Sequence, residues 1–142
     1  MKEKTPKLVR LSFSIEEPLY KKLEKLVRRR RYTNRSEYVR DMIREQLVAR
    51  QWQADEEVLG TVMLVYKHRL RRLGEKLTSL QHHHHKHVLA VTHVHLDQDL
   101  CAEAIIIRGR AGEIQELADE LRQQKGVLHA ALSMSTTGKD MA

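Results

Sequence analysis

The chain has 142 residues, 41% of them hydrophobic, which is enough for one ordinary domain or two small ones. No run approaches the roughly 20 apolar residues that span a bilayer, and no apolar signal-peptide segment follows Lys2 and Lys4. We therefore expect a cytoplasmic protein with no membrane partner. The single cysteine excludes an internal disulfide and suits a reducing compartment.

The net charge of +7 is concentrated in the N-terminal third of the chain. Residues 1–50 carry 15 Lys and Arg against 7 Asp and Glu, a balance of +8. Residues 51–142 carry 11 against 12, a balance of −1. Such a distribution indicates a polyanion-binding module joined to a nearly neutral one, although a merely solvated basic face explains the charge equally well.

The first elements are expected to be a strand and two helices. Residues 1–7 have no hydrophobic periodicity and are typical of a flexible basic tail. Residues 8–15 (LVRLSFSI) alternate strictly between apolar and polar side chains, which predicts a strand. One helix begins near Pro18, and a second begins after Asn34, a suitable N-cap residue that is followed three residues later by Glu37.

The predicted strand at residues 8–15 has no partner within the N-terminal region. Its backbone N–H and C=O groups would be satisfied by the same strand in a second copy of the chain. We therefore expect an obligate dimer that contains a two-stranded antiparallel ribbon. This strand–helix–helix pattern, with NRSEYVRD opening the second helix, resembles the ribbon-helix-helix family of DNA-binding proteins.

The resemblance implies that the ribbon enters the major groove of DNA, where its outward side chains read the edges of the bases. By position, these readers are Arg10, Ser12 and Ser14. The start of the second helix would contact phosphate through its free N–H groups, at Asn34, Arg35 and Ser36. The alternative is that Arg10 and the two serines are only the solvated side of a strand.

A different pattern begins after Gly60. Residues 8–50 are expected to form the DNA-binding domain, residues 51–59 a linker, residues 60–135 a second domain and residues 136–142 a tail. Hydrophobic patterns in the second domain predict strands at 61–68, 87–97, 101–109 and 127–134, and helices at about 70–80 and 112–126. The order βαββαβ is that of a ferredoxin-like, ACT-like unit, so the chain is predicted to be α+β. Fold alone does not give function.

Seven of the nine histidines and the only cysteine lie within residues 82–101. Strand alternation places His93 and His95 on one face, and a short hairpin would bring Cys101 beside them. Two imidazoles and a thiolate form a platform for zinc, copper(II) or nickel(II), and periodicity does not decide among these ions. The alternative is two ordinary strand histidines and a small buried cysteine. The tract HHHH is internal, unlike a cloning tag, and alone indicates weak metal scavenging.

The succession of NRSE, QHHHH, HVH and Cys101 across residues 8–134 resembles the NikR family of nickel-responsive repressors. The resemblance implies one nickel ion per subunit in square-planar geometry. Three ligands, His93, His95 and Cys101, would come from one subunit, and His82 would come from another across a tetramer interface. Glu103 falls at an acidic position where it would accept a hydrogen bond and orient a ligand.

Further positions match or depart from this family. Glu37 and Asp41 lie where the family places an accessory cation, but they could equally face solvent or pair with nearby arginines. The turn between the two N-terminal helices usually has a glycine where this chain has Arg31. Five of the six histidines outside the expected ligand set are candidates for weaker secondary sites: His68, His83, His84, His85 and His87.

The expected function is therefore a nickel-dependent transcriptional repressor, acting as a homotetramer on operator DNA and controlling nickel-uptake genes. It is not expected to be an enzyme. A metal-storage protein would explain the histidine tract but not the basic ribbon. A zinc hydrolase with Glu103 as its base lacks a pocket signature, and a ribbon-helix-helix antitoxin would normally end in a disordered tail.

Overall fold

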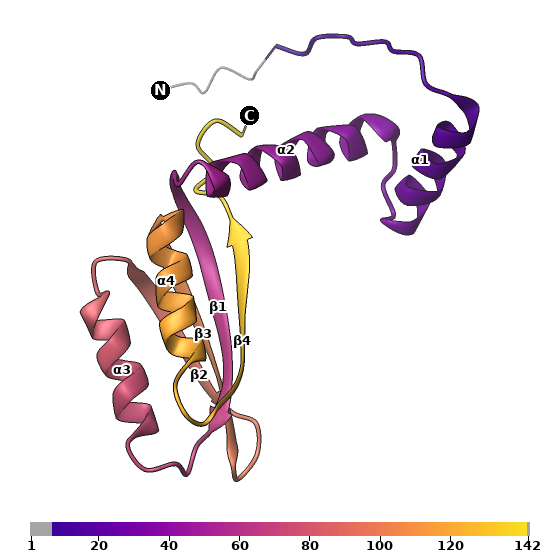
Figure 1. Cartoon of the computed structure of the whole chain (residues 1–142). Helices are drawn as coiled ribbons and strands as arrows, with labels where there is room; N and C mark the ends of the chain where they lie inside the picture. The colour runs from indigo at the N-terminus through magenta and orange to yellow at the C-terminus, as the bar shows by residue number, and fades with distance from the viewer. Residues whose placement is uncertain (1–6, 142) are drawn as a thin grey trace. The chain divides into compact units, whose positions relative to one another are not determined.

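A computed structural model describes residues 7–141, which form two compact units (Figure 1). One unit contains the N-terminal helices as far as Gln46, and the other spans Leu47–Lys139. The basic tail predicted at residues 1–7 lies outside the described range except for Lys7. No helix in the described range is both long and apolar enough to cross a membrane.

The N-terminal unit contains helix α1 (Glu17–Arg29) and the start of helix α2 (Arg35–Gln53). Asn34 is the N-cap of α2, because its Oδ1 accepts the backbone N–H of Glu37 at 2.9 Å. The carboxylate of Glu37 pairs with Arg40 rather than returning to the backbone N–H of Asn34, the contact that would complete a capping box.

The turn between α1 and α2 contains a residue in the left-handed backbone conformation, although no glycine is present in this turn. Arg31 has φ 57°, a conformation that glycine adopts at lower cost. The N–H of Tyr32 donates to the carbonyl of Val27, and that of Arg31 donates to Arg28. These two bonds form a Schellman motif, which satisfies carbonyl groups at the end of α1.

The strand predicted at residues 8–15 is not formed in the single chain, where these residues have no regular secondary structure. Four of their apolar side chains are mostly exposed: Leu8 (82%), Val9 (84%), Leu11 (82%) and Phe13 (62%). A strand requires a neighbour for its backbone hydrogen bonds, and one chain supplies none here. The difference from the prediction is therefore what an intermolecular ribbon would produce in an isolated chain.

The second unit confirms the predicted βαββαβ order. Its elements are β1 (Glu57–Lys67), α3 (Leu73–His83), β2 (Val88–His95), β3 (Leu100–Arg110), α4 (Ala111–Arg122) and β4 (Val127–Ser135). The four strands pair antiparallel in the order β2-β3-β1-β4, with β2 and β4 at the edges.

The linker expected at residues 51–59 is much shorter than predicted. Helix α2 continues to Gln53 and β1 begins at Glu57, so only residues 54–56 connect them. Trp52 and Val58 are both buried in the core of the second unit, at 6% and 0% exposure. Burial of both side chains explains why regular structure extends into this segment.

Helices α3 and α4 cover one face of the sheet (Figure 1). Alternate residues of the central strands point into the core beneath them, among them Val62, Leu64, Ile105 and Ile107. The same alternation places Tyr66, Cys101 and Glu103 on this covered face, where all three are buried. Polar and sulfur-bearing side chains therefore continue the apolar core toward the hairpin of β2 and β3.

Candidate metal centre

The β2–β3 hairpin brings the predicted ligands together through its register. His95 lies directly opposite Cys101, and His93 lies directly opposite Glu103. The turn is closed by Asp97, whose carboxylate accepts the backbone N–H groups of Asp99 and Leu100 at 2.7 and 2.8 Å. As a result, Sγ of Cys101 lies 3.2 Å from Nδ1 of His95.

The thiol of Cys101 is fully buried, with 0% exposure. Burial raises the pKa of Cys101 above its ordinary value, and the negative charges of Glu103 and Asp97 add to the effect. A thiol in this environment remains protonated near neutral pH. A metal ion that binds its sulfur must therefore displace a proton.

His93 is held by groups that leave one of its ring nitrogens available. Its Nδ1 lies 3.1 Å from the hydroxyl of Tyr66 and 3.6 Å from Oε2 of Glu103. Glu103 is buried, and it also accepts a hydrogen bond from the Tyr66 hydroxyl at 3.2 Å. A carboxylate that engages one ring nitrogen while the other faces a metal is the arrangement found around metal-binding histidines.

Glu103 also connects the hairpin to helix α3. Its Oε1 accepts a hydrogen bond from the side-chain amide of Gln81 at 2.5 Å. Gln81 directly precedes His82 in the last turn of α3. Sequence reasoning noted the pair Gln81-His82 only as a motif and did not predict a role for Tyr66, because both contacts depend on how α3 and β1 pack.

Three possible ligand atoms, from His68, His95 and Cys101, lie within 4.8 Å of one another. The ring of His68 stands edge-on to that of His95, with centroids 4.9 Å apart. Its backbone N–H donates to the carbonyl of Asp99 at 2.8 Å, which fixes it beside the hairpin. The sequence suggested only a secondary role for His68, since its approach requires the pairing of β1 with β3.

His82 is not part of this cluster, which is the one potential metal-binding group found in the described part of the chain. It is exposed in the last turn of α3. His93 is close to His95, with ring centroids 5.0 Å apart. The structure therefore groups two of the four predicted ligands, His95 and Cys101, with His68, and it places His93 beside His95.

The chemistry of these donors fits a divalent transition metal such as nickel. Imidazole nitrogen suits zinc, copper and nickel, and thiolate sulfur adds a soft ligand. The distances among the atoms of His68, His95 and Cys101 are short enough for shared coordination. The residues present can therefore hold the ion that the resemblance implies.

The predicted DNA contacts lie in the N-terminal unit. Arg10, Ser12 and Ser14 are exposed on the extended segment, and Ser36 is exposed in the first turn of α2. Arg35 is engaged within the chain, since its guanidinium pairs with Glu24 and donates to the hydroxyl of Tyr20 at 2.6 Å.

The two carboxylates of the suggested accessory cation position have protein partners. Glu37 pairs with Arg40. Asp41 accepts hydrogen bonds from Tyr32 at 2.6 Å and Arg44 at 2.8 Å, and these bonds lower the pKa of Asp41. A cation at this position would have to displace these partners.

Comparison with known families agrees with both halves of this description. A family model described as "NikR C terminal nickel binding domain" matches residues 59–135, and one described as "Ribbon-helix-helix protein, copG family" matches residues 9–50. The chain belongs to the NikR family. This family consists of transcription regulators, so the protein is not an enzyme.

Relatives at the level of the whole chain support the same assignment. One relative comes from Caldanaerobacter subterraneus subsp. tengcongensis, and its name describes a nickel-responsive regulator. It is 42% identical over 94% of this chain and 88% of its own length. A second relative with the same name, from Geotalea uraniireducens, is 46% identical over 94% of this chain and 96% of its own length. An uncharacterized protein from Thermotoga maritima matches in structure with a TM-score of 0.51 at 15% identity, over 56% of this chain and 98% of its own, which bears on fold alone.

Proposed function

We propose that this member of the NikR family is a nickel-dependent repressor, which binds operator DNA as a cytoplasmic homotetramer and controls genes for nickel uptake. The observation that carries this proposal is the group of donors at the β2–β3 hairpin, in a chain whose basic N-terminal segment resembles a DNA-reading ribbon. A storage protein would need only the first of these features.

In this proposal, each subunit holds one nickel ion through His93, His95 and Cys101, and a neighbouring subunit contributes His82. When bound, the ion supplies a centre that joins nitrogen and sulfur donors from two chains. Glu103 supports the proposed role of His93 because it already engages the Nδ1 side of that ring. His68 is the competing ligand within one chain.

The DNA-binding part of the proposal rests on the N-terminal unit. Among the apolar side chains of this unit that the structure describes, only Val27 and Tyr38 are buried, whereas Leu19, Met42 and Ile43 remain 52%, 43% and 54% exposed. A second copy would cover these side chains and pair the extended segments. The ribbon would then present Arg10, Ser12 and Ser14 to base edges, with Asn34, Arg35 and Ser36 placed near phosphate.

The regulatory step follows from thermodynamic linkage. Nickel must bind more tightly to the conformation that is competent for DNA, and operator DNA must in return increase the affinity for nickel. In a tetramer that carries two ribbon-helix-helix dimers, a fixed arrangement of the dimers allows both to bind half-sites at once. The second contact then benefits from a high effective concentration.

The test is to titrate promoter DNA with the protein in the presence of nickel, zinc or copper(II), for the wild-type chain and for Cys101→Ala. Nickel should increase the DNA affinity of the wild-type protein most, and Cys101→Ala should remove that increase while the protein remains folded. An unchanged nickel response in Cys101→Ala would contradict the site. Nickel binding with no effect on DNA affinity would favour storage.

A further inference from the structure

The turn between α3 and β2, residues 84–87, carries three histidines that the proposed metal site does not use, and two of them, His84 and His87, are largely covered. We propose that His84 and His87 are positioning residues, which fix this turn against α4 and thereby hold His82 where a neighbouring subunit requires it. This inference rests on the proposed function, because it gives His82 the role stated there.

Both histidines face carboxylates of α4. Nε2 of His84 lies 3.4 Å from Oε2 of Glu120, and Nδ1 of His87 lies 3.7 Å from Oε2 of Glu113. Both imidazoles are largely covered, with side-chain exposures of 17% and 29%. The two glutamates are seven residues apart, so they lie on the same side of the helix, two turns from each other.

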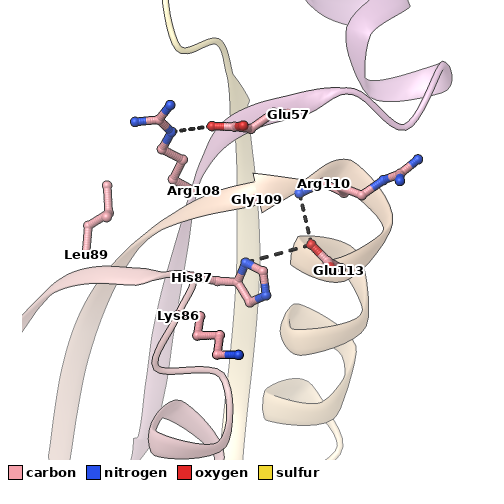
Figure 2. A pocket seen from close by; sticks show the side chains of 8 residues that line it. All are labelled: Glu57, Lys86, His87, Leu89, Arg108, Gly109, Arg110 and Glu113. Carbon is pink, nitrogen blue, oxygen red and sulfur yellow. Dashed lines mark hydrogen bonds and ion pairs between the residues drawn. The ribbon is translucent and has the colours of Figure 1, made fainter.

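The Glu113 oxygen that faces His87 also accepts the backbone N–H of Arg110 at 3.1 Å, while the guanidinium groups nearby have other partners. Arg108 pairs with Glu57 at 2.5 Å, and Arg110 pairs with Asp55 at 3.0 Å. Figure 2 shows His87 pointing toward Glu113 at a pocket that both residues line, with Lys86 nearby.

The backbone of β3 leaves room for the ring of His87. A Cβ atom at Gly109 would lie 2.6 Å from Nδ1 of His87 and 3.3 Å from Oε2 of Glu113. The first contact would force the His87 ring to move, and the second is tighter than an ordinary van der Waals contact. Glycine at this position therefore permits the histidine ring to pack directly on the strand.

Backbone hydrogen bonds transmit this anchoring to the last turn of α3. The carbonyl of His84 accepts the N–H groups of His87 and Val88 at 2.9 and 3.2 Å. The N–H of His84 itself donates to Leu80, inside the helix, at 3.2 Å. Displacement of His87 would therefore loosen a turn that is continuous with the helical turn containing His82.

The test uses His87→Leu, which removes the pair with Glu113, and His87→Gln, whose side-chain amide can still donate to that carboxylate. Gly109→Ala provides an independent disruption, since it displaces the ring while leaving every histidine in place. Matched controls are Gly74→Ala, where an added Cβ meets nothing within 4 Å, and His129→Leu on an exposed part of β4.

The first measurement is hydrogen exchange at the amides of His87 and Val88 in the metal-free protein. His87→Leu and Gly109→Ala should accelerate this exchange, and His87→Gln and both controls should not. The second measurement is nickel-dependent operator binding, in which the same two disruptive variants should require roughly tenfold more nickel, the scale of losing a group that supports a ligand.

Wild-type exchange and wild-type nickel response in both His87→Leu and Gly109→Ala would overturn the proposal. Accelerated exchange with an unchanged nickel response would also overturn it, because the turn would then be anchored without affecting His82. Failure of the proposed function itself is distinguished by Cys101→Ala, which in that case would respond to nickel as the wild-type protein does.

Discussion

The two units of this chain differ in how much of their apolar surface a single copy of the chain buries. The C-terminal unit buries a continuous core under α3 and α4, including Leu64, Ile105 and Leu117 at 0% exposure. The N-terminal unit leaves the apolar face of residues 8–15 in solvent and buries few side chains. One unit can therefore fold around its own core, whereas the other requires a second chain to complete its structure.

The proposed ligands of the metal centre include residues placed by the fold of one chain and a residue that remains exposed. His93, His95 and Cys101 are placed by the sheet of a single chain, while His82 lies exposed at the end of α3. In the proposed site, the fold of one chain would supply three donors and a neighbouring subunit would supply the fourth. Metal binding can then report on how the subunits are arranged.

The largest expected effect is on the incomplete unit. Phe13→Asp places a charge on the face that should be buried between two ribbons, and the loss of one such aromatic contact costs about 3–5 kcal/mol. We expect the dimer to dissociate and DNA binding to disappear, with the C-terminal unit still folded. Analytical ultracentrifugation and circular dichroism would check this, with Glu16→Gln as the control. A variant that stays fully dimeric would contradict the intermolecular ribbon.

A second large effect separates the two histidines that compete for the metal. In the proposed site His93→Ala should abolish tight nickel binding, whereas His68→Ala should weaken it by less than about tenfold. Isothermal titration with nickel measures both. The reverse order would assign the ion to the cluster of His68, His95 and Cys101 instead.

Arg10→Ala tests the DNA-reading face and should cost about 1–3 kcal/mol at the preferred sequence. Because a lost base contact affects only sequences that offer the matching base, the preference among DNA sequences should relax as well. Competition binding with altered half-sites measures this. An equal loss for all sequences would show that Arg10 contacts phosphate.

The smallest expected effect concerns the turn between α1 and α2. Arg31→Gly relieves a left-handed conformation but makes the unfolded chain more flexible, so the net stabilisation should be at most about 1 kcal/mol. Thermal unfolding of the assembled protein would detect it as a higher Tm. A lower Tm would mean that the Arg31 side chain makes stabilising contacts that outweigh its backbone strain.

Patterns along the chain predicted much of this structure because they reflect local chemistry. Alternation located the strands of the second unit, and the side chain of Asn34 marked the start of α2. The neighbourhood of His95 and Cys101 followed from the spacing of a short hairpin. The family resemblance, and no spacing argument, supplied His82 and the choice of nickel.

Contacts that depend on tertiary packing could not be predicted from these sequence patterns. The approach of His68 and the contact of Tyr66 with Glu103 require the register of β1 against β3, and the contact of Gln81 with Glu103 requires α3 to lie on the sheet. The short connection after α2 depends on the burial of Trp52. Each involves residues distant in sequence, whose contacts are set by the tertiary fold.

The central claim is that the nickel site is completed by a neighbouring subunit, and subunit mixing tests it most directly. His82→Ala keeps the hairpin donors but cannot supply the fourth ligand, and Cys101→Ala has the opposite defect. Neither variant alone should bind operator DNA in response to nickel, whereas tetramers reassembled from both should recover part of the response. No recovery in mixed tetramers that are shown to form would contradict a site shared between subunits.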